Sequence, residues 1–208
     1  MKCLIVDDHP LIREGVAQLF RQRRDLAVVH AAGDAAEALL CLNAHSYDIV
    51  IMDINLPDQS GIELVRHLRE ARQTMPVLML SMLPEAGLAL RCIKAGADGY
   101  VSKESPPDEL MEAVRKLLCG RKHFSPEVLF KAAQVAGRSL HDAGHERLSD
   151  REFQVMCMLA TGKSITLIAH SLQLSPNTVS TYRARILDKL GIESNAELTR
   201  FALQHGLV

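Results

Sequence analysis

Five short apolar segments, each followed by a stretch with apolar residues at helical spacing, constrain the fold of this chain more than any other feature. The apolar segments lie at residues 2–6, 26–32, 49–52, 76–81 and 99–103. Apolar runs of this length are typical of strands that are buried on both faces. Repeated strand–helix units place such strands in parallel, with helices on both sides of the sheet. The first 120 residues therefore predict a doubly wound α/β domain with a five-stranded parallel sheet.

The helices between these strands carry start and stop signals of their own. Apolar residues at helical spacing cover residues 11–23. Four further helices are predicted: one from 34 through 40, one that begins at 60 and continues past 68, one that ends at 96, and one from 105 to 120. The signals are the capping-box pairs Asp34 with Glu37 and Ser60 with Glu63, the start at Ser105 and Pro106, and the stops at Gly96 and Gly120. These residue types satisfy the unpaired backbone groups at helix ends or break the helix.

The third strand ends in a carboxylate, Asp53, just before a turn. Taken alone, a capping or loop aspartate is the commoner explanation, because aspartate is frequent where strands meet turns. Ligands of open α/β sheets, however, bind at the carboxyl ends of the strands. Polar residues occur at or just past the ends of four of the five strands: Asp7, Asp8, Asp53, Ser81 and Lys103. A doubly wound sheet would gather them at one edge.

Three carboxylates at one edge predict a cation among them. Without a cation or a shared proton they would repel one another strongly. Oxygen ligands with no cysteine nearby favour Mg²⁺, which keeps several waters and accepts phosphate as a further ligand. Lys103 and Ser81 would then supply a positive charge and a hydroxyl donor for an anion beside the metal.

After Gly120 the strand pattern stops. Residues 125–135 predict one more apolar helix, and residues 137–146 form a polar connector. Four helices are predicted beyond it, at 149–162, 164–172, 175–191 and 194–206, the first opened by the capping box of Ser149 and Glu152. The tight turn through Gln173 and Leu174 before the longer third helix is typical of helix-turn-helix domains. We therefore divide the chain into 1–121, a linker with a helical segment at 122–146, and a small all-α domain at 147–208.

The third of these helices has one apolar and one polar face. At 100° per residue, Val179, Tyr182, Ile186 and Leu190 form the core side, with Leu187 beside them. The candidates for contacts with DNA bases or phosphates are Asn177, Thr178, Ser180, Thr181, Arg183, Arg185 and Lys189. A solvated helix face is the competing explanation, because residues 145–208 hold only 7 Lys and Arg against 6 Asp and Glu.

The composition favours a protein of the cytoplasm that does not enter a membrane. The net charge is -1, and no apolar run approaches membrane-spanning length. Five scattered cysteines are typical of buried thiols in a reducing compartment. His9 is interpreted as a loop residue before Pro10, since a lone histidine is more often structural than a ligand.

The segments DDHPLIREG, DIVIMDINLPDQSG, LMLS and GADGYVSK, in this order, resemble the receiver domain of two-component response regulators. The resemblance implies the sheet order 2-1-3-4-5 of flavodoxin-like folds. It also implies phosphorylation of Asp53 by a sensor histidine kinase, with Mg²⁺ held by Asp8, Asp53 and the backbone carbonyl of Asn55, and Asp7 assisting through water. Lys103 would pair with the acyl phosphate, Ser81 would move toward it, and Tyr100 would swing inward. An ordinary strand aromatic is the alternative for Tyr100.

The last 60 residues resemble the LuxR type of helix-turn-helix, through LSDREFQVMCMLATGKS, LSPNTVSTYRARILDKLGI and NAELTRFALQHGLV. With a receiver ahead of it, the whole chain is similar to NarL/FixJ-family response regulators. It departs from the family at Ile165, Thr166 and Leu167, where polar residues are usual, and at Ser180 and Tyr182, which replace a common lysine and histidine. Arg183, Arg185 and Lys189 are positioned to compensate.

The resemblance implies a transcription regulator rather than an enzyme, in which phosphate at Asp53 controls dimerisation and binding to double-stranded DNA. Coupling two weakly basic modules would strengthen their binding to paired half-sites. One alternative is a protein-interaction switch that has lost DNA binding, favoured if Ile165 and Leu167 form an exposed apolar patch. A metal-dependent phosphatase is a poorer alternative, because no second acid for a substrate ester is evident.

Overall fold

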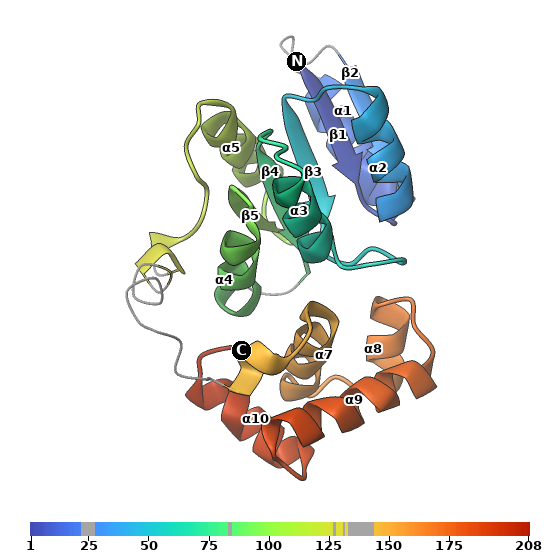
Figure 1. Cartoon of the computed structure of the whole chain (residues 1–208), viewed down its shortest axis with the longest axis vertical. Helices are drawn as coiled ribbons and strands as arrows, with labels where there is room; N and C mark the ends of the chain where they lie inside the picture. Colours follow the sequence, from blue (N-terminus) through green and yellow to red (C-terminus); the bar gives the residue numbers. More distant parts are fainter. Residues whose placement is uncertain (22–27, 83–84, 127, 131, 133–143) are drawn as a thin grey trace. The chain divides into compact units, whose positions relative to one another are not determined.

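The computed structural model describes residues 1–21, 28–82, 85–126, 128–130, 132 and 144–208. The chain forms two compact units, which are described separately below (Figure 1). The first comprises Met1–Glu85 and Arg91–Pro126, and the second comprises Ala86–Leu90 and Glu127–Val208.

The first unit is built on a five-stranded parallel sheet. Its strands are β1 (Lys2–Val6), β2 (Val28–Ala32), β3 (Ile49–Asp53), β4 (Val77–Ser81) and β5 (Gly99–Ser102). Their order is β2-β1-β3-β4-β5, and every pairing is parallel. This confirms the predicted doubly wound fold and its strand order. The three central strands are buried along nearly their whole length, which explains why they are apolar without alternation.

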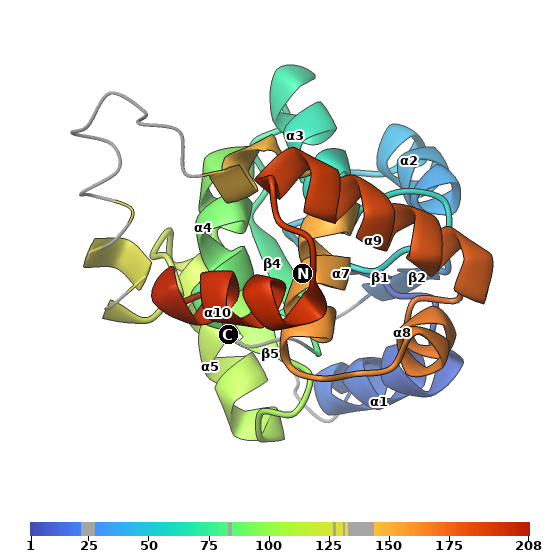
Figure 2. The ribbon, with the colours of Figure 1, turned by 90° about the horizontal axis from the view of Figure 1, so that it is seen from below.

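Helices cover both faces of the sheet. They are α1 (Pro10–Arg21), α2 (Ala35–Ala44), α3 (Gly61–Glu70), α4 (Glu85–Ala95) and α5 (Pro107–Leu118). Figure 2 shows α1 and α5 on one side of the strands and α2, α3 and α4 on the other. Cys3 and Ile5 of β1 pack with Phe20 of α1 and Val114 of α5, as expected for alternate residues of a strand that point to the same face.

The helix ends differ in detail from the predicted signals. Asp34 caps α2, but Glu37 accepts its hydrogen bond from the backbone of Gly33 (2.6 Å) instead of completing the box with Asp34. The Ser60 hydroxyl accepts from the backbone of Ile62 (3.2 Å), one residue earlier than a capping box requires. The prediction that Ser105 opens α5 is wrong, because Pro106 is the N-cap residue. Helix α2 also extends beyond Leu40, to Ala44.

Parts of the predicted linker lie outside the described residues. In the predicted helix at 125–135, residues 126, 128–130 and 132 are helical, and the remaining residues after 126 lie outside the description. The same holds for residues 22–23 of the first predicted helix and for 26–27 of the second predicted strand. The end of the predicted polar connector is ordered, since Gly144–Arg147 form a 3-10 helix, η1.

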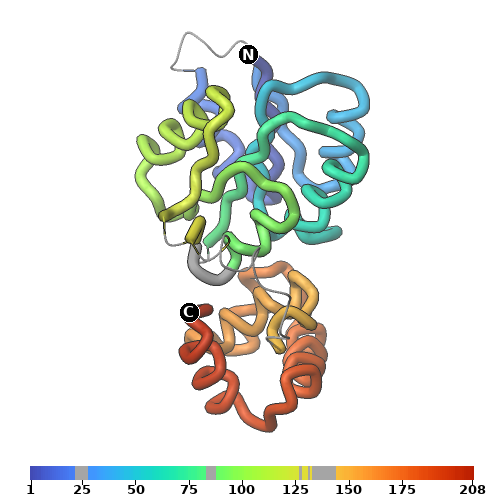
Figure 3. Tube along the Cα trace, turned by 60° about the vertical axis from the view of Figure 1, so that its left-hand side comes forward, coloured from blue at the N-terminus to red at the C-terminus, as the bar shows by residue number. Residues whose placement is uncertain are grey.

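The second unit contains the four predicted helices: α7 (Asp150–Ala160), α8 (Ile165–Ser171), α9 (Pro176–Leu190) and α10 (Asn195–Gln204) (Figure 3). Helix α7 packs against α9 and α10, and α8 packs against α9. Both halves of the capping box of Ser149 and Glu152 are present. Helix α9 ends at Gly191, whose φ of 65° is a left-handed conformation that glycine adopts without strain.

The five cysteines are free thiols. Cys3, Cys92 and Cys157 are buried, but Cys41 is half-buried and Cys119 is exposed, so the expectation of uniformly buried thiols is wrong. A helix with the length and apolarity needed to cross a bilayer does not occur among the described residues.

Candidate phosphorylation site and DNA-binding helix

An acidic cluster lies where β1 and β3 end. Asp53 is the last residue of β3, and Asp7 follows β1 directly. Because the two strands are parallel neighbours, their carboxyl ends meet at the same edge of the sheet. Asp7, Asp8, His9 and Asp53 each offer a ligand atom, and these atoms lie within 4.8 Å of one another. Within the described part of the chain, this is the one such group of carboxylate, imidazole or thiolate ligands.

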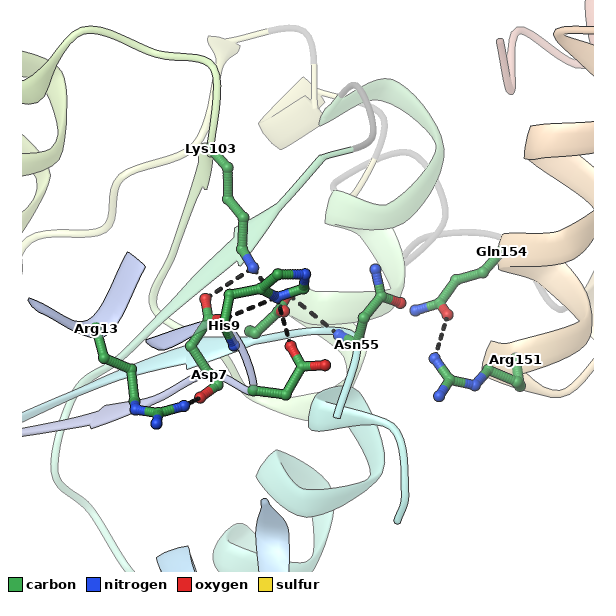
Figure 4. Close-up of polar contacts among 9 residues, drawn as sticks. Asp7, His9, Arg13, Asn55, Lys103, Arg151 and Gln154 are labelled. Carbon is green, nitrogen blue, oxygen red and sulfur yellow. Dashed lines mark hydrogen bonds and ion pairs between the residues drawn. The ribbon is translucent and has the colours of Figure 1, made fainter. Parts of the chain in front are cut away.

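Lys103 lies between two of these carboxylates. Its Nζ donates to Oδ2 of Asp53 (2.6 Å) and forms an ion pair with Oδ2 of Asp7 (2.7 Å) (Figure 4). All three side chains are almost fully excluded from solvent. Lys103 reaches this position because it follows β5, which pairs with β4, and its backbone N–H donates to the Ser81 carbonyl (2.7 Å). The ammonium therefore neutralises part of the acidic cluster.

Burial sets the protonation behaviour of the cluster. It raises the pKa of Asp53 to about 6; Lys103 opposes this rise, Asp7 adds to it, and the backbone N–H of Asn55 opposes it. Burial lowers the pKa of Lys103, but Asp53 and Asp7 more than offset this, and its pKa lies above the ordinary value. Lys103 is consequently a permanent cation in the site, while Asp53 titrates closer to neutrality than an exposed aspartate.

The loop after β3 holds Asp53 through its backbone. The N–H of Asn55 donates to Oδ1 of Asp53 (3.1 Å). Gly61 opens α3 so close to β3 that an added Cβ would lie 2.1 Å from the carbonyl oxygen of Asp53. The carboxylate of Asp58 accepts from the backbone N–H groups of Ala35 (3.1 Å) and Ala36 (3.0 Å), which attaches this loop to the first turn of α2.

His9 is a loop residue before α1, as predicted, but it also lies within the acidic cluster, which was not predicted. Its Nδ1 lies 2.6 Å from Oδ1 of Asp8 and 3.2 Å from Oδ1 of Asp7, and its backbone N–H donates to Asp7 (2.9 Å). Arg13, also unforeseen, donates to the backbone carbonyl of Asp7 (2.5 Å). Figure 4 shows both side chains beside Asp7. The sequence feature that could have indicated this contact is the position of His9 directly after two aspartates.

Ser81 and Tyr100 lie at or near the same edge of the sheet. Ser81 ends β4 and is fully buried. Tyr100 lies on β5 opposite Met79, and only 3% of it is exposed. The tyrosine is therefore buried, unlike an ordinary strand aromatic with its hydroxyl in water. The strand that Ser81 ends, β4, pairs with β3, which ends in Asp53.

The polar face of α9 is accessible. Asn177, Ser180, Thr181, Arg185 and Lys189 are exposed, Thr178 and Arg183 are half-buried, and Val179 and Ile186 are buried on the opposite side. The turn before α9 contains Gln173 with a φ of 52°, and Ser175 caps the helix. This is the geometry by which a helix-turn-helix domain presents one helix to the major groove.

Several side chains on this face already have partners within the protein. Lys189 binds Glu152 (2.6 Å), Arg183 donates to Asn195 (2.7 Å), and the hydroxyls of Ser180 and Thr181 bond to carbonyls one turn earlier. On α8, Leu167 is 49% exposed, whereas Ile165 is half-buried. Of these two residues, Leu167 therefore contributes most of the exposed apolar surface.

Comparisons with known proteins match both units. The family model described as a response regulator receiver domain matches residues 3–115, and that of bacterial regulatory proteins of the luxR family matches residues 146–202. The chain is 34% identical to the response regulator GacA of Pseudomonas aeruginosa, covering 100% of this chain and 98% of that protein. It is 33% identical to the response regulator UvrY of Escherichia coli K12, with 98% and 94% covered.

Solved structures extend this likeness. The response regulator ChrA of a heme-sensing two-component system is 31% identical, with a TM-score of 0.51, covering 100% of this chain and 98% of that one. RcsB of Salmonella enterica serovar Typhimurium, bound to a promoter with a phosphomimetic, is 26% identical, with a TM-score of 0.58 and 99% and 98% covered. The chain therefore belongs to the NarL/FixJ family of two-component response regulators, and it is a phosphorylation-regulated transcription regulator with a receiver domain and a LuxR-type DNA-binding domain.

Proposed function

We propose that Asp53 is the phosphoacceptor of this regulator. The observation that carries the proposal is a carboxylate buried at the end of β3, with the Lys103 ammonium 2.6 Å away and a second acid, Asp7, on the other side of that ammonium. An Asp53 oxygen would attack the phosphorus of a phosphohistidine on a sensor kinase. The P–O bond forms as the P–N bond breaks, and the histidine nitrogen leaves with the electron pair and takes up a proton.

The acidic cluster fits Mg²⁺. Its three carboxylates are hard oxygen donors that lie within reach of one another, and their total negative charge exceeds the single positive charge of Lys103. Asp8, Asp53 and the Asn55 carbonyl would hold the ion, with Asp7 acting through water. When bound, Mg²⁺ supplies positive charge to the oxygens of the transferred phosphoryl group. Lys103 would then bind the acyl phosphate, and the fully buried Ser81 would donate its hydroxyl to it.

In the proposed switch, the phosphate on Asp53 would change the packing of β5. Recruitment of Ser81, which ends β4, would change the packing against the neighbouring strand β5, on which Tyr100 is buried. A local change of charge and packing can bias a two-state surface. We propose that this surface controls homodimerisation, by which two DNA-binding domains, 147–208, engage paired half-sites in the cytoplasm. RcsB, a structural relative, forms dimers on DNA.

Mass spectrometry tests the phosphoacceptor. The full chain, incubated with a small phosphodonor and Mg²⁺, is expected to gain one phosphoryl group that hydroxylamine removes, as it removes acyl phosphates. Asp53→Ala should abolish the gain, whereas Asp48→Ala, an exposed acid of the same segment, should retain it. Full labelling of Asp53→Ala would refute the assignment.

A mobility-shift titration tests the DNA-binding face. The wild-type chain should bind a fragment from a genomic pool in a salt-sensitive manner, and the double variant Arg185→Ala with Ser180→Ala should bind more weakly. Leu167 is the feature that favours the alternative of a protein-docking domain, because it is an exposed apolar side chain. That alternative predicts no DNA binding even at low salt, together with loss of a protein contact in Leu167→Ser.

A further inference from the structure

Two of the three cations on α9 are held by other helices of the same domain. Lys189 Nζ donates to Oε2 of Glu152 at 2.6 Å, and Arg183 Nε donates to Oδ1 of Asn195 at 2.7 Å. Arg185 is exposed and has no ion pair or side-chain hydrogen bond to any residue that the structure describes. The three cations therefore differ in how readily they can turn to a nucleic acid.

Glu152 connects the end of α9 to the beginning of α7. Its Oε2 accepts both from Lys189 Nζ and from the backbone N–H of Ser149 (2.8 Å), which completes the capping box of α7. Lys189 lies in the last turn of α9. Burial raises the pKa of Glu152, but the hydrogen bonds from Lys189 and Ser149 outweigh it, and the pKa lies below its ordinary value. The charged Glu152 carboxylate thus links the beginning of α7 to the end of α9; we call this contact between Glu152 and Lys189 the joint.

This joint is far from the end of α9 that would enter a groove. A helix rises 1.5 Å per residue, so Lys189 lies about 18 Å along the axis from Asn177. In helix-turn-helix domains the amino-terminal residues of the second helix contact the bases. A small rotation at the joint would therefore move the amino end of α9 across the groove.

We propose that Lys189 is a positioning residue: paired with Glu152, it fixes the carboxyl end of α9 on α7 and so sets the angle at which the amino end meets DNA. Arg185, in contrast, is the cation of α9 that contacts DNA. The inference rests on the DNA-binding role of the domain. It reassigns Lys189 from the DNA contacts that the helical wheel suggests, and Arg183, held by Asn195, follows the same pattern.

Matched substitutions separate positioning from contact. Glu152→Gln keeps an acceptor for the Ser149 N–H, because glutamine also completes a capping box, but it removes the charge that holds Lys189. Lys189→Met removes the other half of the pair, and Arg185→Met is the comparison for a direct contact. The full chain, each single variant and the Glu152→Gln/Lys189→Met double variant would be titrated with a duplex selected by the wild type from a random pool. The titrations would cover a series of KCl concentrations.

We expect Glu152→Gln and Lys189→Met each to weaken binding about two- to five-fold, the range that an ion pair of this exposure represents. The double variant should be no weaker than the worse single variant, because both changes break one pair. The slope of log affinity against log salt should stay at the wild-type value in all three. In Arg185→Met the slope should fall by about 0.9, as for the loss of one phosphate contact.

A direct contact between Lys189 and a DNA phosphate would give different results. If Lys189 contacts phosphate, Glu152→Gln frees it and leaves binding unchanged or stronger, while Lys189→Met lowers the salt slope; either result overturns the positioning role. Circular dichroism melts of the same samples show whether a variant is folded, and the salt slope does not depend on the folded fraction. A wild-type chain that selects no duplex would overturn the DNA role itself, and the positioning role with it.

Discussion

Replacement of Gly61 by alanine should damage the receiver domain out of proportion to one methyl group. The added Cβ would lie 2.1 Å from the carbonyl oxygen of Asp53 and 3.2 Å from Cα of Ile54. Unbonded carbon and oxygen atoms approach to about 3.3 Å, so α3 and the end of β3 would have to separate by about 1 Å. The obstacle is backbone on both sides and cannot rotate away. The Gly61 N–H also donates to the Ile54 carbonyl (2.9 Å), which opposes the separation.

The expected cost is at the upper end of the range for overpacking, about 3 kcal/mol. For a domain of this size it corresponds to a fall of roughly 10 °C in the receiver transition. Because Asp53 itself moves, phosphorylation should slow by about 100-fold, as a displacement of 1 Å at a reacting group can cause. Differential scanning calorimetry and the rate of acyl phosphate formation measure the two effects.

Gly15→Ala is the matched control. Gly15 lies inside α1, and an added Cβ there meets nothing within 4 Å. Alanine in a helix interior is favoured over glycine by about 0.5–1 kcal/mol, so this variant should melt a few degrees higher and react at the wild-type rate. Equal melting temperatures for the two variants, or normal phosphorylation of Gly61→Ala, would refute the packing argument.

Three further outcomes follow from charges and caps. Burial raises the pKa of Asp53 to about 6, above the unfolded value, so the folded state binds more protons between about pH 4 and 6 and loses stability as the pH rises. Asp53→Asn should therefore be more stable than the wild type by up to about 3 kcal/mol near pH 7.5 without metal, an advantage that urea melts should show disappearing toward pH 4. Mg²⁺ at 100 times its dissociation constant should stabilise the wild type by about 2.7 kcal/mol and Asp8→Asn by less, and chelation should reverse both shifts. Ser149→Ala removes the cap of α7 and should cost about 1 kcal/mol in the transition of the DNA-binding domain, whereas an unchanged transition would show that the cap contributes little.

The parallel sheet could be predicted from the residue pattern because burial on both faces forces every residue of a central strand to be apolar, whereas its strand order was implied by the resemblance to receiver domains. Ile49 to Met52 satisfy this condition, and the first polar residue, Asp53, marks the end of β3. The same rule places Ser81 at the end of β4. Strand ends are thus readable wherever a buried strand meets a polar site.

Side-chain partners could not be predicted in the same way. The pairing of His9 with Asp8 depends on how the loop after β1 turns, and a histidine has no spacing rule that reveals it. Glu37 has the correct spacing for a capping box with Asp34, yet its carboxylate accepts from the backbone N–H of Gly33, the residue before Asp34. On α9, the wheel identifies the accessible face but not that Lys189 is already bound to Glu152. The Lys189 contact depends on a helix far away in the sequence, and the other two depend on how the backbone turns at a loop or a helix end; residue spacing alone specifies neither.

The ammonium between Asp7 and Asp53 has a consequence for ion selectivity. Three carboxylates and one ammonium leave the cluster with two negative charges, the number that a single divalent cation neutralises. A monovalent ion would leave half of that charge uncompensated in a buried site, where uncompensated charge is costly. Phosphorylation of Asp53, as proposed above, would add further negative charge beside Lys103 and a bound divalent ion. The site is therefore balanced for a divalent cation before any phosphoryl group arrives, and potassium at cellular concentration should compete poorly for it.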